Sequence, residues 1–151
     1  MKDRNETVSI GCRFLTNGEF SDLFHAFSMA FSDYVIPFAL TETQFRNHLN
    51  LNAVDLCRSV GCFEGDAMIG FSLNGFGEWD GKRTVYDAGT GVIPSYRRRG
   101  VSHRMFRYLL PYFKKSGFQN FLLEVITTNT AAVRLYEGLG FQSRRDLALL
   151  Q

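Results

Sequence analysis

The segment from Val92 to Met105 constrains the fold more than any other part of the chain. Its residue order predicts a strand that stops at Pro94, a basic turn that contains Gly100, and then a helix. A turn of this kind directs several backbone N–H groups to one point, at the positive end of a helix dipole. Such a point binds an anion, usually a phosphate or a diphosphate. The alternative for this segment alone is an ordinary solvated, basic start of a helix.

Length and composition favour one globular domain over residues 1–151. Hydrophobic residues make up 45% of the chain and 15 residues are Phe, which argues against disorder. The net charge of +2 is too small for a general nucleic-acid binder. No apolar run approaches the ~20 residues of a membrane span, and the polar residues 1–6 lack the apolar core of a signal peptide. We therefore expect a cytoplasmic protein with neither a membrane nor a nucleic acid as partner.

The three cysteines, Cys12, Cys57 and Cys62, form no Cys-x-x-Cys pair, and no His cluster has the spacing of a metal site. We therefore expect no metal. All three lie in apolar stretches, which predicts buried free thiols and a reducing compartment.

Apolar periodicity predicts the element order βααβββαβαβ. The expected strands cover residues 8–15, 58–64, 67–74, 83–93, 118–126 and 141–150, and the expected helices cover 19–31, 41–51, 101–115 and 129–139. Thr41 and Gln44 have the spacing of a capping box, and Gly140 suits the end of the last helix. The βαβ units predict an α/β fold, with a mixed sheet and helices on both faces.

A second motif runs from Leu123 to Phe141. Asn129 is a sound N-cap, and Tyr136 lies beside the apolar face of the helix that follows. A phenol has a reference pKa near ~10, so it is protonated at neutral pH and can donate a proton to a leaving thiolate. The alternative for Tyr136 alone is a half-buried packing residue.

Together the two segments resemble the GNAT superfamily of acyl-CoA-dependent N-acetyltransferases. The first matches the family's diphosphate turn in the pattern Arg97-x-x-Gly100-x-Ser102, which follows a strand and Pro94. The second matches from Asn129 through Tyr136 to Phe141. The resemblance implies a central twisted mixed sheet. Family members usually close with a longer β-hairpin, so the last strand of that hairpin is expected to be missing, supplied by a partner chain, or cut away with a second domain. A homodimer stays open.

The resemblance implies acetyl-CoA or CoA as cofactor and a primary amine, on a small molecule or a peptide, as acceptor. It implies Tyr136 as the acid that protonates the CoA thiolate, and Glu124 as the general base that some members use. The implied cofactor contacts come from the strand end, the basic turn and the second motif: Thr90, Gly91, Val92, Arg97, Arg98, Arg99, Gly100, Val101, Ser102, His103, Asn129 and Tyr136.

The residues themselves leave the base and the acceptor pocket open. A bound alkyl ammonium must lose a proton before it attacks a thioester, and the candidates for removing it are Glu124, Asp87 and Glu78, in that order. Each can equally be a surface or network carboxylate. The expected acceptor pocket includes Tyr34, Phe38, Asp87 and Trp79.

Two other functions compete with acetyl transfer. One is an acyl-CoA-binding sensor that has lost turnover. The other is a nucleic-acid module that uses Arg97 to Arg99 and Arg104, which the low net charge disfavours.

Overall fold

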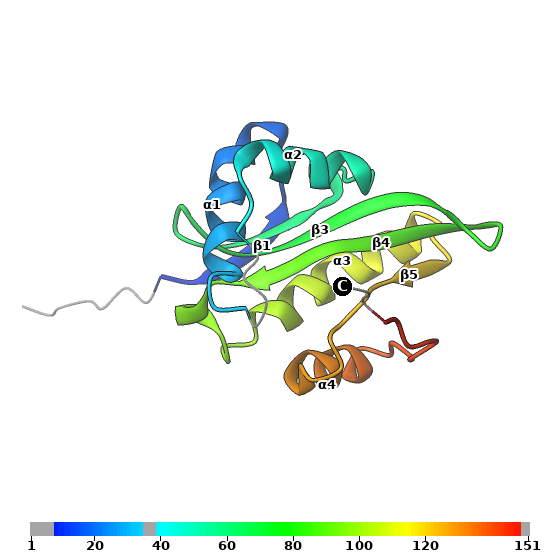
Figure 1. The fold of residues 1–151 in the computed structure, drawn as a ribbon. Helices are drawn as coiled ribbons and strands as arrows, with labels where there is room; N and C mark the ends of the chain where they lie inside the picture. The colour runs from blue at the N-terminus through cyan, green and yellow to red at the C-terminus, as the bar shows by residue number, and fades with distance from the viewer. Residues whose placement is uncertain (1–7, 35–38, 149–151) are drawn as a thin grey trace, which may run out of the picture.

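The computed structural model describes residues 8–34 and 39–148 and contains, within them, a five-stranded sheet in the order β1-β2-β3-β4-β5 (Figure 1). Strands β1 to β4 are antiparallel to one another in sequence order, and β5 is parallel to β4. The mixed sheet is therefore confirmed. The strands are β1 (Ile10–Phe14), β2 (Val60–Glu64), β3 (Ala67–Trp79), β4 (Lys82–Val92) and β5 (Asn120–Leu122).

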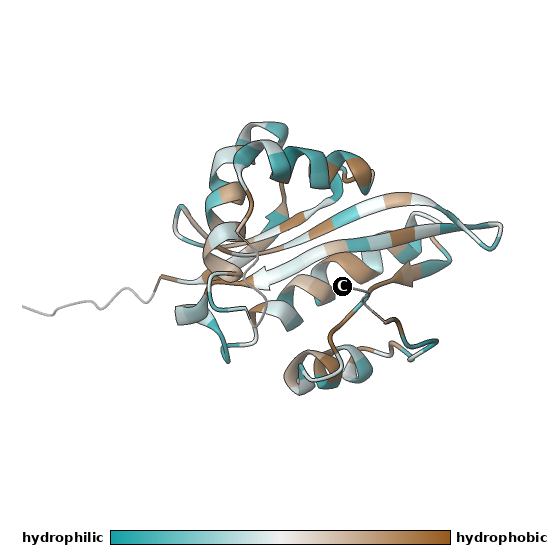
Figure 2. Ribbon diagram, viewed as in Figure 1, coloured by the Kyte–Doolittle hydropathy of each residue, from teal (hydrophilic) through white to brown (hydrophobic). Residues whose placement is uncertain are grey.

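Helices cover both faces of the sheet, as predicted (Figure 1). The helices α1 (Phe20–Ala30) and α2 (Glu42–Leu51) lie on one face, and α3 (Val101–Lys115) lies on the other, with α4 (Thr130–Gly138) on the same side as α3. Each face has its own apolar cluster, and the side of α2 in view is hydrophilic (Figure 2). Phe27, Phe45 and Phe71 anchor the cluster under α1 and α2, while Met105, Phe106 and Leu109 anchor the cluster under α3.

Local signals explain where the helices begin and end. The backbone N–H of Gln44 donates to the Thr41 hydroxyl at 3.2 Å, and the backbone N–H of Thr41 donates to the Gln44 side chain at 2.9 Å. This is the expected capping box. Asn129 accepts from the backbone N–H of Ala132 at 3.2 Å, and Gly140 ends α4 with a φ of +96°. Both predicted caps of α4 are therefore confirmed.

Two strand predictions at the C-terminal end are wrong. The strand expected over 118–126 is reduced to β5, because only its three residues pair with β4. The strand expected over 141–150 is not a strand over 141–148, and its last two positions lie outside the described residues. Phe141 packs against the cluster under α3, but the following residues are exposed and have no ladder partner in the described chain. An alternating pattern alone does not make a strand without a neighbour to pair with.

The cysteine prediction is also wrong. Cys12 and Cys62 face each other across β1 and β2, with Cα atoms 4.1 Å apart, and form a disulfide. Cys57 is exposed. Among the described residues, no three His, Cys, Asp or Glu side chains gather as a metal site would require, and no helix has the length and apolar character to cross a bilayer.

The position of Gly75 on β3 gives a prediction about folding. A Cβ atom at Gly75 would lie 1.9 Å from the backbone oxygen of Asn52, the residue that caps the C-terminus of α2. Gly75→Ala should therefore lower the free energy of unfolding by at least about 2 kcal/mol, measured by urea denaturation. Gly77→Ala is the matched control on the same strand, because a Cβ there meets no atom within 4 Å. Equal effects of the two substitutions would contradict this packing.

Candidate active site

The turn between β4 and α3 presents a row of unpaired backbone donors. Arg98 and Gly100 have positive φ values of 63° and 73°, which curve the chain before α3 begins at Val101. The first hydrogen bond into the helix is from Arg104 N to Gly100 O at 3.0 Å. Within the described chain, none of the N–H groups of residues 98–103 donates a hydrogen bond. A Cβ at Gly100 would meet nothing within 4 Å, so the space beside the turn is open.

These features fit a diphosphate. Six consecutive unpaired amides before and within the first turn of a 15-residue helix are the donors that an anion site requires, and the helix dipole is positive at this end. The residues that the sequence predicts for the cofactor, from Arg98 to His103, are thus brought together by their backbone.

The edge of β4 next to this turn is open. β5 pairs only with Thr84, Val85 and Tyr86, so β4 has no strand partner on this side from Asp87 to Val92 in the described residues. Ile93 N donates to Ile69 O on β3 at 2.9 Å. Because successive strand residues direct their N–H groups to opposite edges, the N–H of Val92 faces the open edge. The predicted strand end, Thr90 to Val92, therefore offers free backbone groups where a pantetheine arm would lie.

A bulge in β4 places two polar side chains on the same face. The register between β3 and β4 shifts at Ala88, so that Leu73 pairs with Gly89 but Asn74 pairs with Asp87. In a regular strand, residues three positions apart point to opposite faces because side chains alternate, so the bulge is what lets Asp87 and Thr90 share one face. His48 of α2 contacts the Ala88 carbonyl oxygen through Nε2 at 2.6 Å and so holds the bulge from the other face.

Asp87 lies at the centre of a buried polar cluster. Its Oδ2 accepts from the Thr90 hydroxyl at 2.7 Å, and its Oδ1 accepts from Gly89 N at 2.8 Å. The Thr90 hydroxyl also lies 3.2 Å from that of Ser72. Burial raises the pKa of Asp87 to about 6, although these hydrogen bonds favour the charged form. Opposite Asp87 on β3, the Oδ1 of the fully buried Asn74 has no hydrogen-bond partner.

Tyr136 extends from α4 toward this cluster. Its ring packs on Phe106 and Phe141, with centroids 5.5 and 5.8 Å away. Burial first, and then the charge of Asp87, raises the pKa of the phenol, while the facing Thr90 hydroxyl partly offsets the increase. The phenol therefore stays protonated at neutral pH, as a proton donor must. Tyr136 is also a packing residue, which was the alternative that the sequence left open, and this packing orients the phenol.

The predicted acceptor residues are only partly brought together. The ring of Tyr34 packs edge-on against Phe31 at 5.3 Å, and the phenol of Tyr34 is close enough to act on the charge of Tyr136. Phe38 lies outside the described residues. Trp79 lies at the turn of the β3–β4 hairpin, half exposed, about 17 Å along the strand from the level of Asp87. The structure therefore does not bring Trp79 to this site.

The two other carboxylate candidates lie outside the cluster. Glu124 is exposed and lies beyond the end of β5. The pKa of Tyr86 is raised mainly by the burial of Tyr86 itself and then by the charge of Glu124. Glu78 is exposed near the end of the same hairpin as Trp79. Asp87, the second of the three in the sequence-based order, is the one that lies beside Tyr136.

The Arg97 side chain is engaged within the protein. Its guanidinium binds Asp33 at 2.6 and 2.9 Å, the Ala30 carbonyl at 2.8 Å and the Val92 carbonyl at 3.2 Å. Arg97 holds the pKa of the Asp33 carboxyl below its usual value. Four of the five donors that an arginine has are thus committed within the chain. Any contact of Arg97 with a phosphate is left mainly to its backbone.

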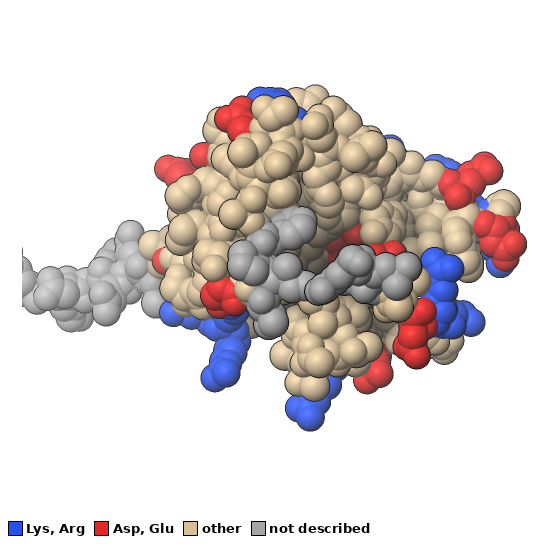
Figure 3. All heavy atoms as spheres, in the orientation of Figure 1, with Lys and Arg blue, Asp and Glu red and all other residues tan. Residues whose placement is uncertain are grey.

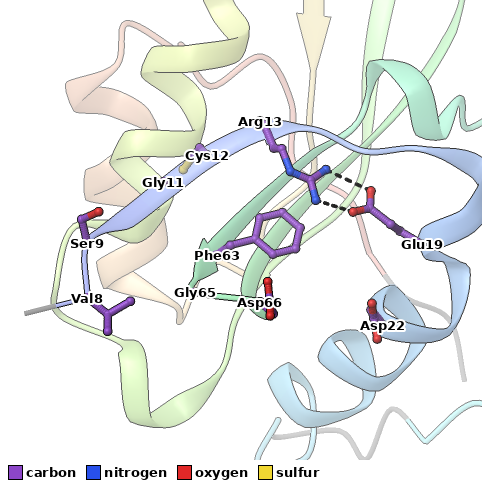
Figure 4. A pocket seen from close by; sticks show the side chains of 10 residues that line it. All are labelled: Val8, Ser9, Gly11, Cys12, Arg13, Glu19, Asp22, Phe63, Gly65 and Asp66. Atoms are coloured by element: carbon purple, nitrogen blue, oxygen red, sulfur yellow. Dashed lines mark hydrogen bonds and ion pairs between the residues drawn. The ribbon is translucent and has the colours of Figure 1, made fainter.

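Figure 3 shows a hollow on the side of the molecule between α1–α2 and α4, with acidic atoms inside it and basic side chains around its margins. A separate pocket of about 660 Å³ lies at the opposite edge of the sheet, beside β1 and the start of α1 (Figure 4). Its walls include the Arg13–Glu19 ion pair and Phe63 but none of the predicted site residues. The predicted residues that the structure brings together lie around β4 and the start of α3, and none of them lines this pocket.

Comparison with known proteins decides the family. The family model for the Acetyltransferase (GNAT) family matches residues 20–141, which include both motifs and strands β2 to β5. The chain belongs to the GNAT acetyltransferase family. The resemblance inferred from the sequence is thereby confirmed.

Relatives within the family add detail. The chain is 40% identical over 50 residues to the ribosomal protein bS18-alanine N-acetyltransferase of Escherichia coli (strain K12), which is 33% of this chain and 34% of that enzyme's length. The crystal structure of the ribosomal-protein-S18-alanine N-acetyltransferase from Escherichia coli has a TM-score of 0.73 at 21% identity, over 91% of this chain and 80% of that one. AAC(6')-Iy, solved with a CoA-containing bisubstrate analog, has a TM-score of 0.70 at 15% identity, over 95% and 97% of the two chains. At these identities the structures show the fold.

The raised pKa of Asp87 predicts how stability depends on pH. Its folded-state pKa is about 6, against a reference of 3.8. The folded state then binds more protons than the unfolded state between these values, so the free energy of unfolding falls as the pH rises from about 4 to about 6. The contribution is about 3 kcal/mol. Asp87→Asn should remove this pH dependence. In urea denaturation, the free energy of unfolding of the wild type relative to the variant should therefore fall by this amount between about pH 4 and pH 7. A difference that does not change with pH would contradict the assignment.

Proposed function

We propose that the protein is an N-acetyltransferase that moves an acetyl group from acetyl-CoA to a primary amine by direct attack. The observation that carries the proposal is the juxtaposition of the free amides of residues 98–103, the open edge of β4 and the Tyr136 phenol. Membership of the GNAT family supports it, as do the relatives named as N-acetyltransferases. We also propose that the acceptor is a small molecule or a peptide, that the protein is cytoplasmic, and that it can form a homodimer.

The residues divide the binding work between them. The amides of residues 98–103, at the N-terminus of α3, hold the diphosphate. Arg98 and Arg99 add positive charge around it. The Asn129 side chain caps α4 and so fixes the helix that carries Tyr136. When bound, acetyl-CoA supplies an activated acetyl thioester. The Val92 N–H, at the open edge, is placed to donate to the carbonyl oxygen as negative charge develops there.

The acid and the base act on each other. We assign the proton acceptor for the amine to Asp87, reached directly or through a water, with Glu124 as the alternative that the family resemblance implies. The negative charge of Asp87 is one cause of the raised pKa of Tyr136. When Asp87 takes up a proton, that cause disappears and the phenol becomes a stronger acid. Removing the amine proton therefore prepares Tyr136 to donate its own proton to the departing thiolate.

Acetyl-CoA consumption over a panel of amines tests the proposal. We expect CoA thiol release with at least one member of a panel that includes peptides with a free N-terminus and small primary amines. Gly100→Glu should abolish CoA binding, measured by calorimetry, because a carboxylate would face the diphosphate across a few ångströms. Gly81→Glu is the matched control, since it has a similar φ of +70° and equally open surroundings at a distant hairpin turn.

Two results would redirect the proposal. Tight CoA binding without turnover on any amine would favour the sensor function. Retained CoA affinity in Gly100→Glu would contradict the turn as the diphosphate site.

The Tyr136 assignment predicts a specific kinetic change. Tyr136→Phe keeps the ring that packs on Phe106 and Phe141 but removes the proton. The kcat should fall about 100-fold while the Kd for CoA stays within about twofold. Steady-state kinetics and calorimetry measure the two quantities.

Variants of the two carboxylates complete that experiment. Asp87→Asn should lower kcat in the same direction as Tyr136→Phe, and Glu124→Gln should have a small effect. A larger loss of kcat from Glu124→Gln than from Asp87→Asn would assign the base to Glu124. An unchanged kcat in Tyr136→Phe would contradict the assignment of Tyr136 as the acid.

A further inference from the structure

We propose that Arg97 is a positioning residue, which clamps the end of α1 to the cofactor turn and so sets the acceptor side of the active site, and that its side chain is not a diphosphate ligand. The inference rests on the proposed acetyl transfer for its functional meaning. Its structural content is independent of that function.

One guanidinium ties together three segments that are distant in the sequence. Arg97 lies in the turn, 64 residues after Asp33, to which it binds through both Nη atoms. Its Nη2 also donates to the carbonyl of Ala30, the last residue of α1, and its Nε donates to the carbonyl of Val92, the last residue of β4. Both carbonyls lie at the ends of their elements, where the helix and the sheet leave acceptors unpaired.

The charge of Arg97 suits this position. The C-terminus of α1 is the negative end of a helix dipole, and a cation placed there is stabilised. Asp33 adds a full negative charge immediately beyond the helix. The side chain is therefore attracted by a dipole, a carboxylate and a strand carbonyl at the same time, before any ligand is present.

The clamped segments are the ones that frame the reaction. Asp33 is followed directly by Tyr34, whose phenol lies close enough to Tyr136 to help raise the pKa of the Tyr136 phenol. The Val92 peptide borders the open edge of β4, where the thioester carbonyl would lie. Loosening Arg97 would therefore change the distance between α1 and β4, through which an amine reaches the thioester. The diphosphate amides of residues 98–103 would remain.

The competing explanation makes a prediction of opposite sign. If the Arg97 guanidinium binds the diphosphate, Asp33 competes with the cofactor for it, and neutralising Asp33 should tighten CoA binding. If Arg97 is a clamp, neutralising Asp33 weakens the clamp, and CoA affinity hardly changes.

The experiment uses Asp33→Asn, Arg97→Met and the double variant of the full chain. Calorimetry measures the Kd for CoA, steady-state kinetics measures the acceptor KM, and thermal unfolding without ligand measures the clamp itself. We expect Asp33→Asn to leave the Kd within about twofold and to raise the acceptor KM about threefold, because the ion pair is partly exposed. Arg97→Met loses the two carbonyl contacts as well, so the acceptor KM should rise about tenfold.

Two controls and a non-additivity test sharpen the result. Asp22→Asn removes an exposed carboxylate from the first turn of α1 and should change none of the three measurements. Arg98→Met, in the same turn, should weaken CoA binding more than Arg97→Met does. The unfolding temperature should fall in Asp33→Asn and in Arg97→Met, and the double variant should resemble Arg97→Met alone.

The proposal would be overturned if Asp33→Asn bound CoA more tightly than the wild type and Arg97→Met lost more than about tenfold in CoA affinity. Additive effects on ligand-free unfolding would overturn it as well, because two residues of one clamp cannot act independently. Asp33→Asn changes a half-exposed surface group, so it keeps the test informative if Arg97→Met does not fold. Absence of turnover in the wild type would count against the acetyl transfer alone, since the unfolding measurements need no ligand.

Discussion

The departure of β5 from β4 after Tyr86 is the constraint on which the site depends. A strand with a neighbour on each side has no free backbone groups, because the ladders use them all. Here β4 continues for six residues beyond its last pair with β5, so its outer edge can bind an extended ligand. The same departure leaves room for α4 to bring Tyr136 to the Asp87–Thr90 cluster. The open edge, the acid and the turn that begins α3 thus follow from one short strand.

The carboxylate and the phenol illustrate why the position of a charge matters more than its identity. Asp87 and Glu124 are both acidic residues near β4, yet only Asp87 is buried and faces the phenol. Burial raises the pKa of Asp87 to about 6, closer to neutral pH than that of an ordinary carboxyl, which favours its taking up a proton. A surface carboxylate has no comparable effect on Tyr136.

The sequence predicted the fold to the extent that the signals were local. The capping box at Thr41, the cap at Asn129 and the glycine at the end of α4 depend on neighbours three or four residues away, so they could be inferred and are confirmed. Membership of the GNAT family followed from two such local motifs. The last strand was predicted wrongly because pairing requires a partner strand, which no local pattern contains.

The site was predicted less completely, for the same physical reason. The backbone turn around Gly100 is local and was found. The contact of His48 with Ala88 joins residues 40 positions apart, and the Arg97–Asp33 pair joins residues 64 positions apart. Nothing in the spacing of these residues indicates the contact. Arg97 was predicted as a cofactor residue from its place in the motif, and no signal in the sequence indicated that its side chain binds Asp33 and the Ala30 carbonyl. The disulfide between Cys12 and Cys62 was missed because it needs the β1–β2 register.

The bulge at Ala88 makes the site sensitive to the length of β4 as well as to the types of residue in it. Val85 and Val92 both belong to the cluster under α3 although they are seven positions apart, an odd number that regular alternation would not allow. Deletion of Ala88 would make the alternation regular and keep Thr90 and Val92 on the face of Asp87, but it would remove the carbonyl that His48 contacts. Deletion of a residue from the regular part of β4 would instead turn the side chains that follow it in the strand to the opposite face. Evolution can therefore tolerate many replacements along β4 more readily than the gain or loss of a single residue.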